Sequence, residues 1–177
     1  MQTRFAVILA AALLASPIVV SSAHAAGDGG SGGTVTKCKD GKVWDKKQQK
    51  CVVPKQGMLD DDSIYEAGRD LAMAGRYGEA IEVLGMAADK TDPRILNYLG
   101  YSHRKSGRIQ VGLGYYQEAL RINPDYTLVR EYLGEAYIQL GDVAAARTQL
   151  GEIEKRCGKG CAEYAELAKE IDAFVKG

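Results

Sequence analysis

Histidine is scarce in this chain, with only two among 177 residues, His24 and His103. His24 lies in an apolar N-terminal stretch, so His103 is the only one left to serve a Ser-His-Asp or Cys-His arrangement. Carboxylates show no paired motif, and the Gly-rich step at 112–114 falls inside an expected helix without a preceding strand, unlike a dinucleotide fingerprint. We therefore predict no catalytic residues, no cofactor and no enzyme activity. His103 is expected to be a packed residue between helices.

An excess of either charge is also missing, because 23 Lys or Arg balance 23 Asp or Glu. This balance argues against a globally basic nucleic-acid binder. The charge is unevenly placed, however. Residues 37–55 hold seven lysines and two aspartates, a net charge of +5, whereas residues 56–177 hold fifteen basic and twenty acidic residues, a net charge of −5.

Long apolar runs are absent after residue 20. The one run, residues 5–20, follows Arg4 and precedes the small residues around Ala25, which is the layout of a cleavable signal peptide over residues 1–25. An uncleaved anchor is the alternative, but the run is shorter than the ~20 residues of a spanning helix and is broken by Pro17. No cysteine follows it, so a lipoprotein anchor is not expected. We predict a periplasmic or secreted protein without a membrane-spanning segment in its mature part.

Cysteine is limited to four residues, which suits an oxidising compartment. Two local pairs, Cys38 with Cys51 and Cys157 with Cys161, are our choice among three possible connectivities. A redox or metal role for the second pair is the alternative. A redox pair would need a thioredoxin-like βαβ setting, and zinc would need two further ligands, so no metal is predicted.

Residues 26–36 are small and Gly-rich and predict a flexible leader. Residues 37–55 predict a small basic hairpin stapled by its disulfide, with a turn at residues 40–41. The pattern Cys-x-x-Gly-x-Val-Trp-Asp, followed by Cys-Val, loosely resembles half of a peritrophin-type chitin-binding module. That resemblance implies that Trp44 stacks on a sugar; the alternative is that Trp44 packs over the disulfide.

Glycines recur along the rest of the chain at a period near 34. Gly68, Gly100 and Gly134 are separated by 32 and 34 residues, and another series follows at Gly75, Gly107 and Gly141. Matching small residues (Ala80, Gly112, Ala146) and large ones (Leu84, Tyr116, Leu150) follow each series. We expect the large residues to fill the layer between successive repeats. This pattern resembles the tetratricopeptide repeat. The resemblance implies an all-α solenoid of helix-turn-helix units within residues 56–177, with repeats near 61–92, 93–126 and 127–160. Apolar residues at helical spacing predict a capping helix at 161–175.

Each glycine series has a physical reason. The first lets the two helices of a pair approach closely, and the second can take the left-handed conformation that ends a helix. Three positions depart from the family pattern: Asp92 stands where proline is expected, Arg130 where an apolar residue is expected, and Gly158 replaces a proline. Terminal repeats are often atypical.

The resemblance further implies that the first helices of successive pairs line a concave surface where partners bind. Positions at i, i+4 and i+7 share one helix face. The residues expected there are Tyr65, Arg69, Met73, Asn97, Tyr101, Arg104, Lys105, Glu131, Glu135 and Ile138. Tyrosine and arginine are enriched at binding hot spots.

The sequence therefore predicts a non-catalytic scaffold or adaptor that binds a peptide segment or helix of another envelope or secreted protein. The alternative is that the Trp44 hairpin binds a glycan or an anionic polymer while the repeats act as a spacer. A homodimer formed through the capping helices stays open.

Overall fold

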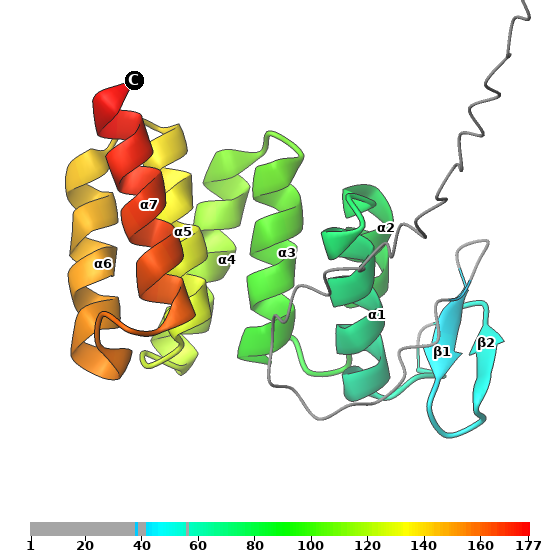
Figure 1. Ribbon diagram of the computed structural model, residues 1–177. Coiled ribbons are helices and arrows are strands. Elements are labelled where there is room, and N and C mark those ends of the chain that lie inside the picture. The colour runs from blue at the N-terminus through cyan, green and yellow to red at the C-terminus, as the bar shows by residue number, and fades with distance from the viewer. Residues whose placement is uncertain (1–37, 39–41, 56) are drawn as a thin grey trace, which may run out of the picture. The chain divides into compact units, whose positions relative to one another are not determined.

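The computed structural model describes Cys38, residues 42–55 and residues 57–177. The predicted signal peptide and Gly-rich leader lie outside the described residues. A two-stranded antiparallel hairpin precedes seven helices (Figure 1), so the predicted all-α solenoid after a disulfide-linked hairpin is confirmed. The elements are β1 (Val43–Asp45), β2 (Lys50–Val52), α1 (Asp61–Met73), α2 (Tyr77–Leu84), α3 (Pro93–Lys105), α4 (Ile109–Ile122), α5 (Thr127–Gln139), α6 (Val143–Cys157) and α7 (Ala162–Lys176).

Six of these helices form three pairs, each closed by a tight turn. Gly75, Gly107 and Gly141 follow the first helix of each pair with φ angles of 76°, 84° and 77°. Residues with a Cβ rarely take this left-handed conformation, so glycine ends each first helix as predicted. Along the stack, α1 contacts α3, α3 contacts α5, and α5 contacts α7.

Small residues allow the helices of the middle pair to touch. A Cβ on Gly100 would lie 2.7 Å from the Tyr116 ring and 3.2 Å from the Gly112 carbonyl oxygen, so only glycine fits there. The third pair differs from our expectation. A Cβ on Gly134 would lie 2.6 Å from the Leu167 side chain of α7, so Gly134 faces α7. Leu150 is only partly buried. Helix α7 packs against α5, so it covers the layer that Leu150 was expected to fill.

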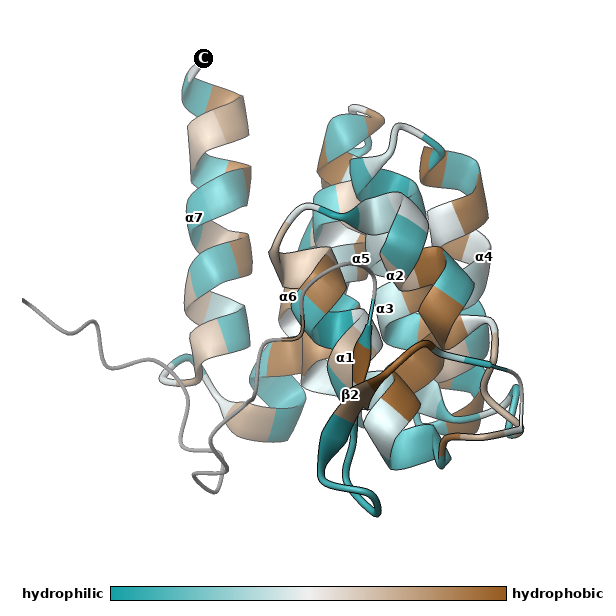
Figure 2. Cartoon of the chain, turned by 90° about the vertical axis from the view of Figure 1, so that its right-hand side faces the viewer, coloured by the Kyte–Doolittle hydropathy of each residue, from teal (hydrophilic) through white to brown (hydrophobic). Residues whose placement is uncertain are grey.

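The core runs through the stack as three clusters of buried apolar side chains, and Figure 2 shows hydrophobic and hydrophilic residues alternating along each helix. The first cluster includes Val43 of β1, which is 2% exposed and lies with Leu59 and Ile64. The hairpin therefore shares the core of α1 and α2. Among the described residues, no helix is long and apolar enough to span a membrane.

The three departures from the repeat pattern have local explanations. Asp92 caps α3, because its carboxylate accepts from the Arg94 backbone N–H at 2.8 Å and Pro93 occupies the first helical position. Arg130 donates to the Pro124 carbonyl oxygen at 2.7 Å, which holds the preceding turn. Gly158 has a φ of 76° and ends α6.

Candidate partner-binding face

Helices α1, α3, α5 and α7 lie next to one another along the stack, and we call the surface they form the first-helix face. The ten residues predicted to line it differ in exposure. Met73 and Lys105 are exposed, and Tyr65, Arg69, Tyr101 and Glu135 are half-buried. The remaining four are buried: Asn97, Arg104, Glu131 and Ile138. Helical spacing placed these four on the right helices, but neighbouring helices cover them, so they do not form open surface.

Four tyrosines form a continuous series of ring contacts across this face. The centroid distances are 5.9 Å from Tyr65 to Tyr98, 6.2 Å from Tyr98 to Tyr101, and 5.0 Å from Tyr101 to Tyr132. We call these four residues the tyrosine row. It crosses from α1 through α3 to α5. The sequence analysis missed Tyr98 and Tyr132, although the i, i+3 spacing of Tyr98 and Tyr101 could have indicated a shared face.

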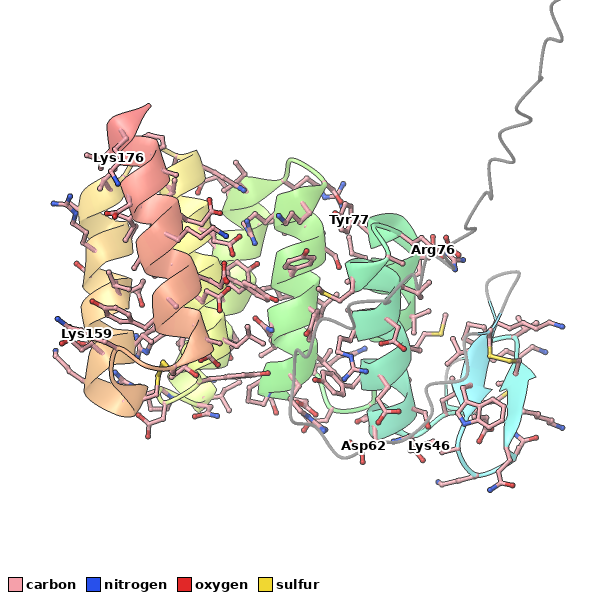
Figure 3. All side chains as sticks on the ribbon, viewed as in Figure 1. Lys46, Asp62, Arg76, Tyr77, Lys159 and Lys176 are labelled. Carbon is pink, nitrogen blue, oxygen red and sulfur yellow. A yellow bond between two sulfur atoms is a disulfide. The ribbon has the colours of Figure 1, made fainter. Side chains whose placement is uncertain are left out.

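Cationic side chains lie over the more exposed rings. The Arg94 guanidinium is 4.8 Å from the Tyr65 centroid, and the Lys105 ammonium is 5.5 Å from the Tyr101 centroid. Tyr77 lies at the start of α2 (Figure 3). Its ring centroid lies 6.2 Å from that of Tyr101. This part of the face therefore offers aromatic surface bordered by the Lys105 ammonium and by the Arg94 guanidinium, which is paired with Asp62 and Asp92.

Arg104 lies beneath this row with a side chain that is 0% exposed. Its Nε donates to the Tyr116 hydroxyl at 3.3 Å, and its Nη2 forms an ion pair with Glu135 Oε2 at 2.7 Å. That ion pair lacks the alignment of a hydrogen bond, and Nη1 has no hydrogen-bond partner among the described residues. The guanidinium also faces the Tyr101 and Tyr132 rings. Arg104 thus joins α3, α4 and α5.

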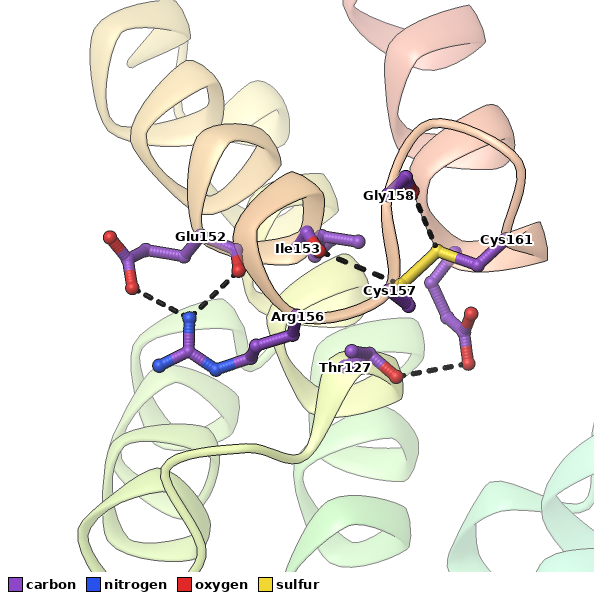
Figure 4. Close-up of a disulfide and its surroundings, with 8 residues drawn as sticks. Thr127, Glu152, Ile153, Arg156, Cys157, Gly158 and Cys161 are labelled. Carbon is purple, nitrogen blue, oxygen red and sulfur yellow. Dashed lines mark hydrogen bonds and ion pairs between the residues drawn. A yellow bond between two sulfur atoms is a disulfide. The ribbon is translucent and has the colours of Figure 1, made fainter.

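Carboxylates gather at the α5–α7 end of the face. Glu131 is 9% exposed, and burial raises its pKa to about 8, with further contributions from the charges of Glu135, Glu163 and Glu166; Arg104 opposes the shift. We call Glu131, Glu135, Glu163 and Glu166 the acidic cluster. Glu163 accepts a hydrogen bond from the Thr127 hydroxyl at 3.1 Å (Figure 4). The first-helix face is therefore aromatic at one end, where Arg94 and Lys105 lie over the rings, and acidic at the other.

The loop before α7 carries the second disulfide, Cys157–Cys161 (Figure 4), and the first joins Cys38 to Cys51, as predicted. The sulfurs of Cys157 and Cys161 lie within 4.8 Å of a Glu163 carboxylate oxygen. Thiolates bind metals, but a disulfide lacks them, so these atoms could hold a metal ion only after reduction. In the oxidised protein the pair connects α6 to α7.

Within the hairpin, Trp44 is half-buried and is the cross-strand partner of Cys51. Two lysines of the predicted basic hairpin form ion pairs with acidic residues at the start of the helical stack. Lys46 lies 2.6 Å from Glu66, and Lys47 lies 3.6 Å from Asp60. Part of the hairpin's positive charge is thereby balanced within the fold.

His103 is half-buried between the helices of the middle pair. Its ring stacks on Tyr115 at 5.3 Å, and Nδ1 accepts a hydrogen bond from Arg108 Nε at 2.9 Å. Burial, and secondarily the Arg108 charge, lower its pKa. A depression over α3 and α4 is lined by Leu96, Val111, Gly114, Tyr115 and Glu118. That depression lies outside the tyrosine row.

Residues 65–127 and 99–160 match the tetratricopeptide repeat family. The chain is 26% identical over 115 residues to the TPR repeat-containing thioredoxin TTL4 of Arabidopsis thaliana; the match covers 63% of this chain and 16% of that relative. This chain therefore spans about a sixth of the relative's length.

Several solved structures share the fold. The first TPR of Spaghetti (RPAP3), bound to the HSP90 peptide SRMEEVD, has a TM-score of 0.57 at 19% identity, covering 67% of this chain and 94% of that one. The Yersinia enterocolitica chaperone SycD in complex with a peptide of the translocator YopD has a TM-score of 0.54 at 18% identity, covering 65% and 88%. PcrH in complex with the chaperone binding region of PopD has a TM-score of 0.57 at 20% identity, covering 67% and 96%.

Proposed function

Because the chain belongs to the tetratricopeptide repeat family, we propose that it is a non-catalytic scaffold whose first-helix face binds a peptide segment or helix of another protein. The tyrosine row is the observation that carries this proposal. Tyr65 and Tyr101 expose part of their rings beside Arg94 and Lys105. Such amphipathic rings supply a large contact area together with a polar group.

Similar folds support this assignment. The three solved structures compared above are complexes with peptides or segments of partner proteins. We extend that mode of binding to this chain as a proposal. We further propose that the protein acts as an adaptor in the cell envelope or outside the cell, because its two disulfides suit an oxidising compartment and its first 25 residues have the pattern of a signal peptide.

The double variant Tyr101→Ala with Lys105→Ala tests the proposed face. The purified protein is used to select binders from a displayed library of random peptides, and the enriched peptides are titrated by fluorescence anisotropy. We expect the double variant to lose about tenfold or more in affinity, as hot-spot residues do. Arg104 is left unchanged because its truncation would leave Glu135 and Tyr116 without a buried partner.

Val111→Ala with Arg121→Ala is the matched control, since both residues are exposed on α4. It should keep the affinity of the unaltered protein, and circular dichroism should show equal helicity for all three proteins. The proposal fails if no peptide is enriched, or if the Tyr101 and Lys105 variant binds the enriched peptides as tightly as the control.

The alternative, glycan or anionic-polymer binding through Trp44, has less support. Trp44 is half-buried, and Lys46 and Lys47 already have acidic partners. Val43 ties the hairpin to the core of the first helical pair. These contacts favour a structural role for the hairpin.

A further inference from the structure

The acidic cluster favours a particular kind of side chain at the α5–α7 end of the first-helix face. Building on the function proposed above, we infer that the acidic cluster receives a lysine or arginine side chain of the bound peptide. The cluster combines four carboxylates from two helices, Glu131 and Glu135 of α5 with Glu163 and Glu166 of α7.

Charge balance is the first argument. Arg104 pairs with Glu135, and the exposed Lys169 lies 3.4 Å from Glu166. Glu163 has the neutral Thr127 hydroxyl as its partner. Glu131, nine-tenths buried, has no ion pair or hydrogen bond from a side chain in the described part of the protein. A buried carboxylate without a partner is destabilising, and an incoming cation would relieve that penalty.

Arg104 supplies a second, independent observation. Its guanidinium is fully buried and aimed into the cluster, since Nη2 lies 2.7 Å from Glu135, yet Nη1 has no acceptor among the described residues. An unmet buried donor is also costly. A peptide offers both missing partners at once, because a backbone carbonyl can accept from Nη1 while a basic side chain meets the carboxylates. The half-buried Tyr101 ring, 5.5 Å from the guanidinium, would turn aside to admit that carbonyl.

The surroundings of the cluster also suit an organic cation. The Tyr101 and Tyr132 rings already face one cation, because the Arg104 guanidinium lies 5.5 and 5.7 Å from their centroids, and aromatic rings attract ammonium and guanidinium groups. Burial is the main cause of the raised pKa of Tyr132, and the charges of Tyr98, Glu131, Tyr101 and Glu135 add to it. An aromatic wall beside carboxylates recognises lysine and arginine side chains.

A divalent metal fits the cluster less well. Among the described residues, the one group of three ligands whose atoms converge within 4.8 Å is Cys157, Cys161 and Glu163. The carboxylates of the acidic cluster are therefore more widely spaced than the oxygen ligands of calcium or magnesium. A guanidinium spreads five N–H donors over three nitrogens, so an arginine side chain spans separated carboxylates better than a metal ion does, and a lysine ammonium would meet fewer of them.

The peptides enriched in the selection above provide the test. We expect lysine or arginine to be enriched in them, and we expect Glu131→Gln with Glu163→Gln to weaken their binding about tenfold. A variant of each peptide, in which norleucine replaces the basic residue, should bind the unaltered protein and the glutamine variant with equal affinity. This comparison is a double-mutant cycle across the interface, so it isolates the pair from any general loss of fold.

Asp172→Asn is the matched control. Asp172 is exposed on the side of α7 opposite Glu163, about half a turn round the helix. Its substitution should therefore leave every peptide affinity unchanged. Glu163→Gln alone, at a half-buried position, guards against misfolding of the double variant and should give part of the loss. Affinity should not depend on added calcium or on a chelator.

Failure of this inference is distinguishable from failure of the proposed function. The inference is overturned if peptides bind through Tyr101 and Lys105 but show no basic enrichment, or if the glutamine variants bind them as tightly as the Asp172→Asn control. It is also overturned if binding requires calcium. If no peptide binds at all, both proposals fall together.

Discussion

Two charged side chains, Arg104 and Glu131, are buried in the helical stack, and they differ in how they are compensated. Arg104 has Glu135 and the Tyr116 hydroxyl as partners and is surrounded by tyrosine rings. Glu131 has mostly like charges around it. Loss of either partner of the Arg104–Glu135 pair would destabilise the contact between α3 and α5, whereas Glu131 is itself destabilising whenever it is ionised.

Glu131 therefore predicts a pH dependence of stability. Its pKa rises from 4.5 to about 8 on folding, so the folded state holds the proton more tightly. The free energy of unfolding should fall as the pH rises from about 4.5 to 8, by a few kcal/mol at most. Burial is the main cause of the raised pKa of Glu131; the charges of Glu135, Glu163 and Glu166 add to it, and that of Arg104 opposes it.

Glu131→Gln should remove most of that decrease, so its melting temperature at pH 8 should exceed that of the unaltered protein. Denaturant unfolding at several pH values measures the effect, with Asp172→Asn as the exposed control. Identical pH profiles for Glu131→Gln and the unaltered protein would contradict the assignment.

Helix α7 packs against α5 and α6 and so covers the apolar surface of the third helical pair. Leu167 is 0% exposed and Ile171 is 3% exposed, and both lie in the last core cluster. Leu167 also contacts Gly134 of α5, where no side chain on α5 could fit. The Cys157–Cys161 disulfide closes only a short loop beside this packing.

The packing of α7 should consequently matter more than its disulfide. Leu167→Ala should lower the free energy of unfolding by about 2–5 kcal/mol. Cys157→Ser with Cys161→Ser should lower it by roughly 2 kcal/mol in the loop-entropy account. Guanidinium unfolding followed by circular dichroism measures both.

Adding a reductant to the unaltered protein should destabilise it at least as much as the double serine substitution does, because the reductant opens Cys38–Cys51 as well as Cys157–Cys161, and it should destabilise Leu167→Ala further. A larger loss from the serine pair than from Leu167→Ala would show that the covalent link, and not apolar burial, holds the helix in place.

At the scale of the whole molecule, the residues from Val43 onward behave as one stack with a cover at each end. Helix α7 covers one end, and the hairpin covers the other through Val43, Lys46 and Lys47. Solenoids need such end units because each repeat buries its apolar surface only against its neighbours. The hairpin is thus structurally connected to α1.

Removal of the hairpin should destabilise the stack without removing the binding face. For a chain that begins at Gly57, the free energy of unfolding should fall by about 2 kcal/mol or more, since the burial of one valine side chain contributes about 1.5–3 kcal/mol. Its affinity for the selected peptides should be unchanged. Val43→Ala should give part of the stability loss, and Trp44→Ala, at a half-buried position, should give less.

Thermal unfolding and the peptide titrations described above measure the two effects separately. A loss of peptide affinity with unchanged stability would reverse the assignment and point back to the hairpin as the binding element.

The sequence by itself determined the features that depend on local spacing. The period of the glycines resembles the tetratricopeptide repeat, and that resemblance implied three helical pairs; Gly75, Gly107 and Gly141 do take the left-handed conformation that ends each first helix. The two local cysteine pairs were also predicted correctly. Backbone conformation and short loops depend on neighbours in the chain, so a single sequence contains the information needed to predict them.

Only the tertiary structure decided which residues of the first-helix face are accessible. Helical spacing placed Tyr101 and Arg104 on the same face, yet Tyr101 is half-buried and Arg104 is covered by side chains of α4 and α5. The structure also showed that α7 meets Gly134 and that the hairpin shares the core. Exposure depends on which distant segments pack over a residue, and spacing along one helix does not contain that information.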